Sequence, residues 1–84
     1  MTEQKNHLQL TITRVDGPLF DGPVEFVTLP GILGELTVLA HHEALISPLQ
    51  SGTIRLRRAD GQDEVFTIEG GVLEISDNQA TVLL

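Results

Sequence analysis

The stretch LPGILGELTVLAHHEALISPLQSG, residues 29–52, decides the fold of this chain. Pro30-Gly31, Gly34 and Ser51-Gly52 are turn signals that cut it into short pieces. No uninterrupted apolar run in the chain exceeds three residues, as at 38–40. Short apolar pieces between tight turns are typical of strands at the rim of a sheet, so we expect this segment to form a border that docks on other molecules.

The sequence on either side of this stretch alternates with the period of a strand. Leu8, Leu10 and Ile12 are separated by polar residues, which places one face inward and the other toward water. A similar alternation before and after Asp60-Gly61 predicts a hairpin of residues 53–58 with 64–69. The strand candidates together are residues 8–12, 24–29, 35–39, 53–58, 64–69, 72–76 and 80–84.

Turn and helix signals complete the fold prediction. Asp16-Gly17-Pro18 and Asp21-Gly22-Pro23 predict two turns that flank Leu19-Phe20, and Asp77-Asn78 predicts another. The only helical turn we expect covers residues 41–46, ended by Ser47-Pro48. With no amphipathic helix of ten residues, the chain predicts an all-β, antiparallel sandwich or barrel. We expect one domain over residues 1–84, with 1–7 as a loose tail.

Composition excludes several classes of partner. Five basic against twelve acidic residues give a formal charge of −7, which repels a nucleic-acid backbone. The absence of Trp and Tyr removes the stacking platforms that single strands need. No apolar run approaches the roughly 20 residues of a membrane span, and the start MTEQKNH lacks the apolar core of a signal peptide. We therefore expect any membrane association to be indirect, through other proteins.

The residues that could carry chemistry form no recognisable catalytic or metal pattern. His41, His42 and Glu43 are adjacent, and neighbouring side chains on a strand or helix do not converge on one ion. No GK[ST] follows a glycine-rich stretch, so a phosphate-cradling loop is not predicted. Asp60, Asp63 and Glu64 fall at a hairpin tip and are interpreted as a solvated face. We expect no enzyme activity, metal or cofactor.

Four segments, taken in order, resemble a known family. LFDGPVEFVTLPGILGELTVLAHH, LQSGTIRLRR, EGGVLEIS and ATVLL are similar to the amino-terminal domain of the epsilon subunit of F-type ATP synthase, over about residues 8–84. The resemblance implies a flattened β-sandwich of about ten short strands. It also implies a non-catalytic rotor part of the central stalk that docks on the gamma subunit and the c-ring and couples ion translocation to ATP synthesis.

The resemblance assigns two groups of contact residues. The turn facing the c-ring corresponds to Gly31, Ile32, Leu33, Gly34 and Glu35, and the gamma-facing positions correspond to Arg14, His41, His42 and Thr53. Ile32 and Leu33 are apolar where many family members are polar, which suggests a buried contact. The alternative interpretations are an ordinary exposed carboxylate for Glu35 and a structural imidazole for His42.

Three further expectations follow from the resemblance. The implied location is peripheral, on the cytoplasmic face of the bacterial inner membrane or the equivalent face of an organelle. Most family members continue into a helical hairpin that can inhibit ATP hydrolysis, and we expect this chain to couple the rotor without that switch. The alternative that the residues leave open is a free-standing β-sandwich adaptor or small-ligand binding module.

Overall fold

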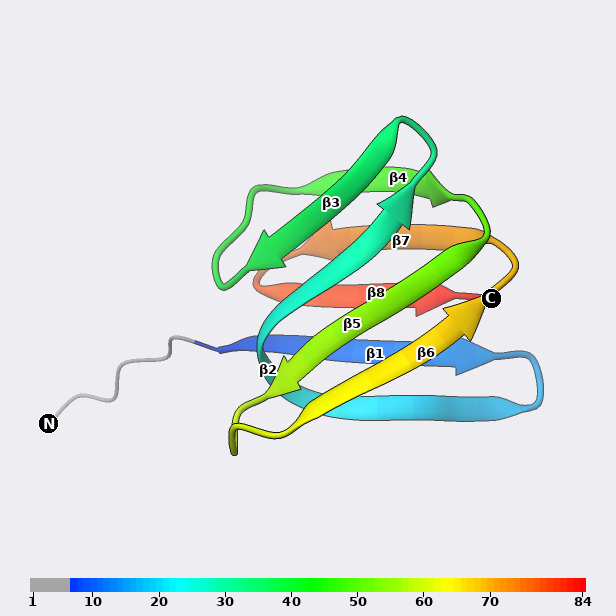
Figure 1. Cartoon of the computed structure of the whole chain (residues 1–84). Helices are drawn as coiled ribbons and strands as arrows, with labels where there is room; N and C mark the ends of the chain where they lie inside the picture. Colours follow the sequence, from blue (N-terminus) through cyan, green and yellow to red (C-terminus); the bar gives the residue numbers. More distant parts are fainter. Residues whose placement is uncertain (1–6) are drawn as a thin grey trace, which may run out of the picture.

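The computed structural model describes residues 7–84 and folds them into eight strands (Figure 1). The strands are β1 Leu8–Arg14, β2 Gly17–Gly31, β3 Gly34–Leu39, β4 Leu45–Leu49, β5 Gly52–Arg58, β6 Asp63–Ile68, β7 Gly71–Ser76 and β8 Gln79–Leu83. The predicted all-β sandwich is confirmed, with eight strands in the described residues instead of about ten.

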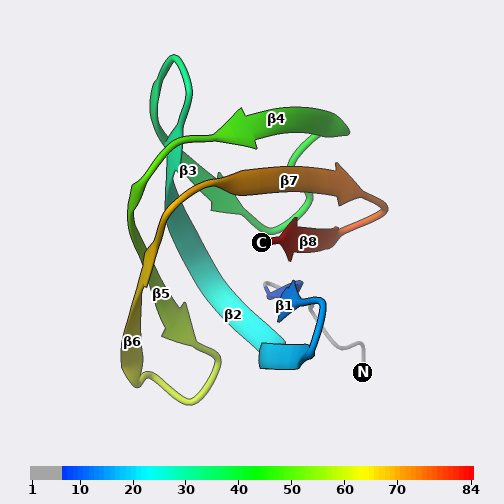
Figure 2. The ribbon, with the colours of Figure 1, turned by 90° about the vertical axis from the view of Figure 1, so that its right-hand side faces the viewer.

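The strands form two layers that share β2. Figure 2 shows β1, β8, β7 and β4 in one layer and β3, the second half of β2, β5 and β6 in the other. Hydrogen bonding follows the order β1-β8-β7-β4-β2-β5-β6, with β3 added beside β2 and a further pairing of β1 with β2. Within residues 7–84 all pairings are antiparallel except β1 with β8, which run parallel.

The core lies between the layers and follows the alternation of the sequence. β1 contributes Leu8, Leu10 and Ile12, and each is fully buried while Gln9 is exposed. The strands β1, β2, β5, β7 and β8 each contribute two or three buried apolar residues. The strands β3, β4 and β6 contribute one each, which are Val38, Leu49 and Ile68. Within the described part of the chain no buried side-chain nitrogen or oxygen lacks a hydrogen-bond partner. The interior is therefore a single apolar cluster without polar defects.

One predicted turn is wrong, because Asp21-Gly22-Pro23 lies inside β2. Asp21 and Pro23 pair with Thr11 and Gln9 of β1, and the side chains of Thr11 and Gln9 donate hydrogen bonds to Asp21 Oδ1 over 3.1 and 3.3 Å. The Pro23 carbonyl accepts from Ala59 N at 3.0 Å, so the missing N–H of Pro23 points away from β1. The strand can therefore continue through the proline, and the strand expected at residues 24–29 extends back to Gly17.

The helical turn expected at residues 41–46 is also wrong, because the chain turns at Ala40-His41 and then extends into β4. His41 has φ 63° and its N–H donates to Asn78 Oδ1 at 2.7 Å. Pro48 lies within β4 opposite Val72, and its carbonyl accepts from Ile32 N at 3.1 Å. The missing N–H thus faces away from β7, and the proline removes no bond from that ladder.

Two further local predictions are confirmed. β5 and β6 form the predicted hairpin, and β7 and β8 meet at Asp77-Asn78, where positive φ angles of 50° and 61° are typical of a tight two-residue turn. The tail predicted at 1–7 lies outside the described residues except for His7, whose carbonyl accepts from Asn78 Nδ2 at 2.9 Å. In residues 7–84 there is no helix long and apolar enough to span a membrane.

Candidate partner-binding surfaces

The turn between β2 and β3, residues 31–35, lies at one corner of the sandwich and is fixed to the end of β4 (Figure 1). Ile32 N donates to Pro48 O at 3.1 Å. Gln50 donates twice, from its backbone N to Pro30 O at 2.9 Å and from Nε2 to Gly31 O at 2.8 Å. The turn that the resemblance assigns to the c-ring is thus held in place on the side of β4.

Both glycines of this turn are required by the backbone. A Cβ on Gly31 would lie 2.7 Å from the carbonyl oxygen of Gly34, which real Cβ atoms do not tolerate. Gly34 has a φ of +136°, a backbone conformation that residues other than glycine rarely adopt. These two glycines let the chain reverse within two residues, and the side chains between them therefore project outward.

The side chains of the turn are mainly apolar and exposed. Leu33 is 99% exposed, Ile32 is 51% exposed, and Glu35 is exposed beside them. An exposed large apolar side chain at a rigid tip is uncommon in a surface that meets only water. The turn therefore has the properties of a contact site with a mixed apolar and anionic character.

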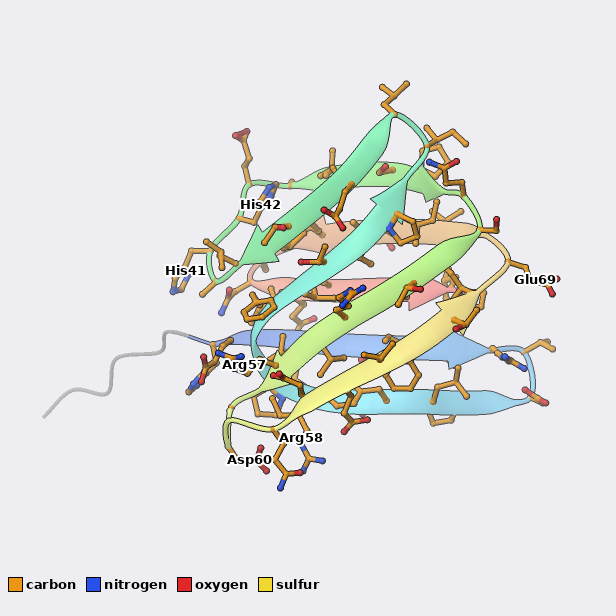
Figure 3. The ribbon with its side chains drawn as sticks, in the orientation of Figure 1. His41, His42, Arg57, Arg58, Asp60 and Glu69 are labelled. Carbon is orange, nitrogen blue, oxygen red and sulfur yellow. The ribbon has the colours of Figure 1, made fainter. Side chains whose placement is uncertain are left out.

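The four residues predicted to face gamma do not form one patch. His41 and His42 lie in the β3–β4 connection, and Asn78 bonds to both His41 and His7, the residue that precedes β1. Arg14 is the last residue of β1 and therefore lies at the opposite end of this strand. His42 is half-buried, and a 2.7 Å hydrogen bond joins its Nδ1 to the carbonyl of Glu43. Thr53 lies on the outer face of β5, opposite Thr67, and so belongs to the other layer. Figure 3 shows the two histidines at one edge of the molecule, away from Glu69.

A second apolar surface, not predicted from the sequence, covers the outer side of β4, β7 and β8. Val72 lies opposite Pro48 on β4 and opposite Leu83 on β8, and these residues share the outer face with Ile46, which lies opposite the exposed Glu74. Ile46, Leu83 and Val72 are 69%, 49% and 41% exposed. We call this set of Ile46, Pro48, Val72 and Leu83 the apolar face. The alternation of β7 was the available signal, since Leu73 and Ile75 point inward and Val72 must therefore point outward.

The outer side of the other layer has a different chemistry. Arg57 Nε donates to Asp63 Oδ1 at 2.8 Å, and its guanidinium lies 5.4 Å from the centre of the Phe26 ring. At the end of the β5–β6 hairpin Arg58 pairs with Asp60 at 3.1 Å and with Glu64 at 3.0 Å, and Glu64 lies opposite the buried Leu56, on the inward-facing side of the layer. Figure 3 labels Arg57, Arg58 and Asp60 around this hairpin. The hydrogen bond from Arg57 lowers the pKa of Asp63, and the same bond raises the pKa of Arg57. The acidic residues interpreted as a solvated face are therefore also paired with arginines.

The described residues contain no arrangement suited to metal binding. No group of three or more His, Asp or Glu side chains in residues 7–84 is placed to hold an ion. What the structure presents is a rigid sandwich with an apolar turn and an apolar face on adjoining sides. Exposed apolar side chains at a turn and on one face are features typical of surfaces that bind other proteins.

Comparison with known proteins identifies the family. Residues 7–84 match the model of the ATP synthase Delta/Epsilon chain β-sandwich domain, and the chain belongs to this family. An ATP synthase epsilon chain from Bordetella petrii is 42% identical over 76 residues, which cover 90% of this chain and 54% of the relative. An ATP synthase epsilon chain from Latilactobacillus sakei is 34% identical over 85 residues, which cover 99% of this chain and 59% of the relative. The chain thus spans somewhat more than half of these relatives.

Solved structures show the same fold. A chain of the Euglena gracilis mitochondrial ATP synthase, solved as OSCP/F1/c-ring in rotational state 1, matches with a TM-score of 0.87 and 26% identity over 98% of this chain and 52% of that chain. A chain of the Tetrahymena thermophila mitochondrial ATP synthase central stalk and c-ring matches with a TM-score of 0.73 and 19% identity, over 98% and 65%. The second likeness supports the fold alone.

Proposed function

We propose that this chain is the β-sandwich part of the epsilon subunit of an F-type ATP synthase, a non-catalytic component of the rotor. The observation that carries this function is the match of residues 7–84 to the Delta/Epsilon β-sandwich family, together with 42% identity to a bacterial ATP synthase epsilon chain. Membership of this family removes the alternative of an unrelated free-standing module. The chain would transmit rotation between ion flow and nucleotide chemistry, both of which take place on other subunits.

In this function the β2–β3 turn contacts the c-ring. The turn projects from one corner, is bonded to β4, and exposes Ile32, Leu33 and Glu35. A rigid tip suits a contact that must carry torque, because an element that is already ordered loses little conformational entropy on docking. This is the turn to which the resemblance assigns the contact with the c-ring.

The apolar face is the surface that gamma would cover. Arg14 and the pair His41-His42 lie at opposite ends of β1, so they bracket this face along the strand direction. Thr13, which precedes Arg14, pairs with Leu83 of the apolar face. Thr53 lies on the other layer and would meet gamma only if gamma reached around the edge of the sandwich.

Location follows from this assembly. A chain held by gamma and the c-ring would be a peripheral component at the membrane, on the cytoplasmic face in a bacterium or the equivalent face in an organelle. Its formal charge of −7 gives it no attraction of its own to anionic lipid or to nucleic acid. Its attachment would therefore depend on protein contacts.

Reconstitution tests the function directly. Membrane vesicles whose ATP synthase has been stripped of its own epsilon subunit should bind the purified chain and regain ATP-driven ion pumping. The matched control is the double variant Ile46→Gln with Val72→Gln, which alters two exposed residues and should fold but not bind. Failure of the unsubstituted chain to bind gamma, the c-ring or the stripped vesicles would contradict the proposed function.

A further inference from the structure

The side chain of Asn78 joins three parts of the chain that are far apart in the sequence. Asn78 belongs to the β7–β8 turn and is half-buried. Its Oδ1 accepts from His41 N at 2.7 Å, across 37 residues, and its Nδ2 donates to His7 O at 2.9 Å, across 71 residues. One partner is an N–H and the other a carbonyl, so the amide fits in only one orientation. The β7–β8 turn is thus tied to the β3–β4 connection and to the residue before β1.

The backbone of Asn78 adds a third bond at the same place. Gln9 N donates to Asn78 O at 3.2 Å, and Gln9 is also the residue at which the parallel pairing of β1 with β8 begins, opposite Gln79. Figure 1 shows the β3–β4 connection, the β7–β8 turn and the start of β1 along the same edge of the molecule. One residue therefore connects all three segments at this edge.

The β3–β4 connection needs such support because of the backbone at His41. Its φ of 63° lies in the left-handed region, which is unfavourable for a residue with a Cβ. A residue other than glycine persists in this region only where the surrounding structure holds it, and such residues are frequent at functional sites. His41 is exposed and His42 is half-buried, and the resemblance assigns both to the contact with gamma. The bond from Asn78 thus holds the backbone where these two side chains are set.

The turn itself does not require the amide of Asn78. Asp77 and Asn78 have φ angles of 50° and 61°. Asparagine tolerates this left-handed conformation better than most residues, but glycine tolerates it better still. Glycine would therefore satisfy the turn and lose the bonds to His41 and His7. These bonds, and not the turn, account for an asparagine at this position.

We propose that Asn78 is a positioning residue for the binding of gamma, because its side chain holds the β3–β4 connection in the conformation that presents His41 and His42. The inference rests on the proposed function and adds to it a residue that acts through the connection. A segment that is already ordered loses less conformational entropy on docking than a mobile one does. The affinity for gamma should therefore depend on the bond between Asn78 and His41.

The alternative is that Asn78 only stabilises the fold. Its loss would then lower the free energy of unfolding and leave the affinity of the folded chain for gamma unchanged. The positioning role instead changes the affinity of a chain that remains folded, and changes it for gamma alone. Binding to the c-ring serves as the reference, because the β2–β3 turn is held by its own bonds to Pro48 and Gln50.

The first test is Asn78→Gly, made in the full chain and measured against immobilised gamma and c-ring of its own ATP synthase. Hydrogen exchange followed by NMR should show the His41 amide protected in the unsubstituted chain and exchanging at least about tenfold faster in the variant. The affinity for gamma should fall about fivefold, since the connection must then be ordered on binding, and the affinity for the c-ring should not change. Circular dichroism should show that the variant is folded under the conditions of the assay.

Asp77→Gly is the matched control. It places a glycine in the same turn at the other residue of positive φ, and Asp77 is exposed. The turn should persist, because glycine is favoured at both central positions of such a turn. The exchange of the His41 amide and the affinities for gamma and the c-ring should therefore match those of the unsubstituted chain.

Asn78→Asp separates the two side-chain bonds. An aspartate keeps an oxygen that accepts from His41 N and loses the donor to the His7 carbonyl. It also tolerates the left-handed conformation. The His41 amide should stay protected, and the affinity for gamma should stay within about twofold of that of the unsubstituted chain, because the bond to His41 is the one that positions the connection.

The outcomes separate the inference from the function it rests on. An unprotected His41 amide in the unsubstituted chain, or unchanged affinity of Asn78→Gly for gamma, would overturn the inference and leave the rotor function standing. Equal losses for gamma and the c-ring, or an Asn78→Asp variant as weak as Asn78→Gly, would also overturn it. If the unsubstituted chain binds neither partner, the proposed function fails and the inference fails with it.

Discussion

The two outer sides of this sandwich differ although their inner sides are alike. Each layer contributes buried aliphatic side chains to the same core, such as Leu73 from β7 and Leu56 from β5. Outward, the β4–β7–β8 layer exposes the apolar face with Glu74 beside Ile46, whereas the layer with β5 and β6 exposes the Arg57–Asp63 ion pair together with Arg55 and Val65. The difference shows that burial of the core does not account for the apolar residues of β4, β7 and β8.

The physical contrast lies in what each side would lose if it were covered. Covering the Arg57–Asp63 pair would remove two charges from water, at a cost that the pair itself does not always recover. Covering Val72 and Leu83 removes apolar surface from water, at a gain of about 25 cal/mol per Å². One side is therefore suited to association and the other to solvent.

The largest expected effect is a difference in the free energy of unfolding between variants of Leu73 and Val72, two adjacent residues of β7 that point to opposite sides of the sheet. Leu73→Ala removes a fully buried side chain and should lower the free energy of unfolding by about 2–5 kcal/mol. Val72→Ala removes an outward side chain and should change it by no more than about 0.5 kcal/mol. Urea unfolding followed by circular dichroism measures both. Equal destabilisation by the two variants would mean that the outer side of β7 is part of the core.

A smaller effect, on binding, should distinguish the two outer sides themselves. Val72→Gln on the apolar face should weaken association with gamma by about tenfold, as loss of a central apolar contact does. Val65→Gln makes the same change on β6, where Val65 is 60% exposed, and should leave the affinity unaltered. Surface plasmon resonance on immobilised gamma compares them. The reverse ranking would place the docking surface on the charged side.

Part of the fold could be predicted because strands such as β5 and β7 alternate between buried and more exposed residues. The hairpin of β5 with β6 and the turn at Asp77-Asn78 both follow from local patterns. The course of β2 could not be predicted, because whether a proline interrupts a strand depends on which way its missing N–H points. At Pro23 and Pro48 the N–H position faces away from the paired strand, and that direction is set by tertiary structure.

Of the two candidate surfaces, the β2–β3 turn could be predicted from the sequence and the apolar face could not. The β2–β3 turn follows from Gly31 and Gly34, whose backbone demands are local. The apolar face was missed because no strand was predicted over residues 45–49 and Ile46 was assigned to a helical turn, so its outward direction was not recognised. Its assembly from three strands also depends on register, which brings Pro48, Val72 and Leu83 into one row. No single segment of the sequence contains that row.

The smallest expected effect concerns the charged side and acid. The hydrogen bond from Arg57 lowers the pKa of Asp63 below its ordinary value, so the ionised carboxylate is favoured in the folded state. A group whose folded pKa is depressed stabilises the fold above its unfolded pKa, and the stabilisation disappears as pH falls through the folded value. Asp63→Asn should therefore lower the urea midpoint slightly at about pH 6, and the difference between the two chains should shrink as the pH falls and the carboxylate becomes protonated. Because both groups are exposed, added salt should shrink the difference at about pH 6. If the urea midpoints of the two chains still differ at low pH and high salt, Asp63 stabilises the fold by packing and not through its charge.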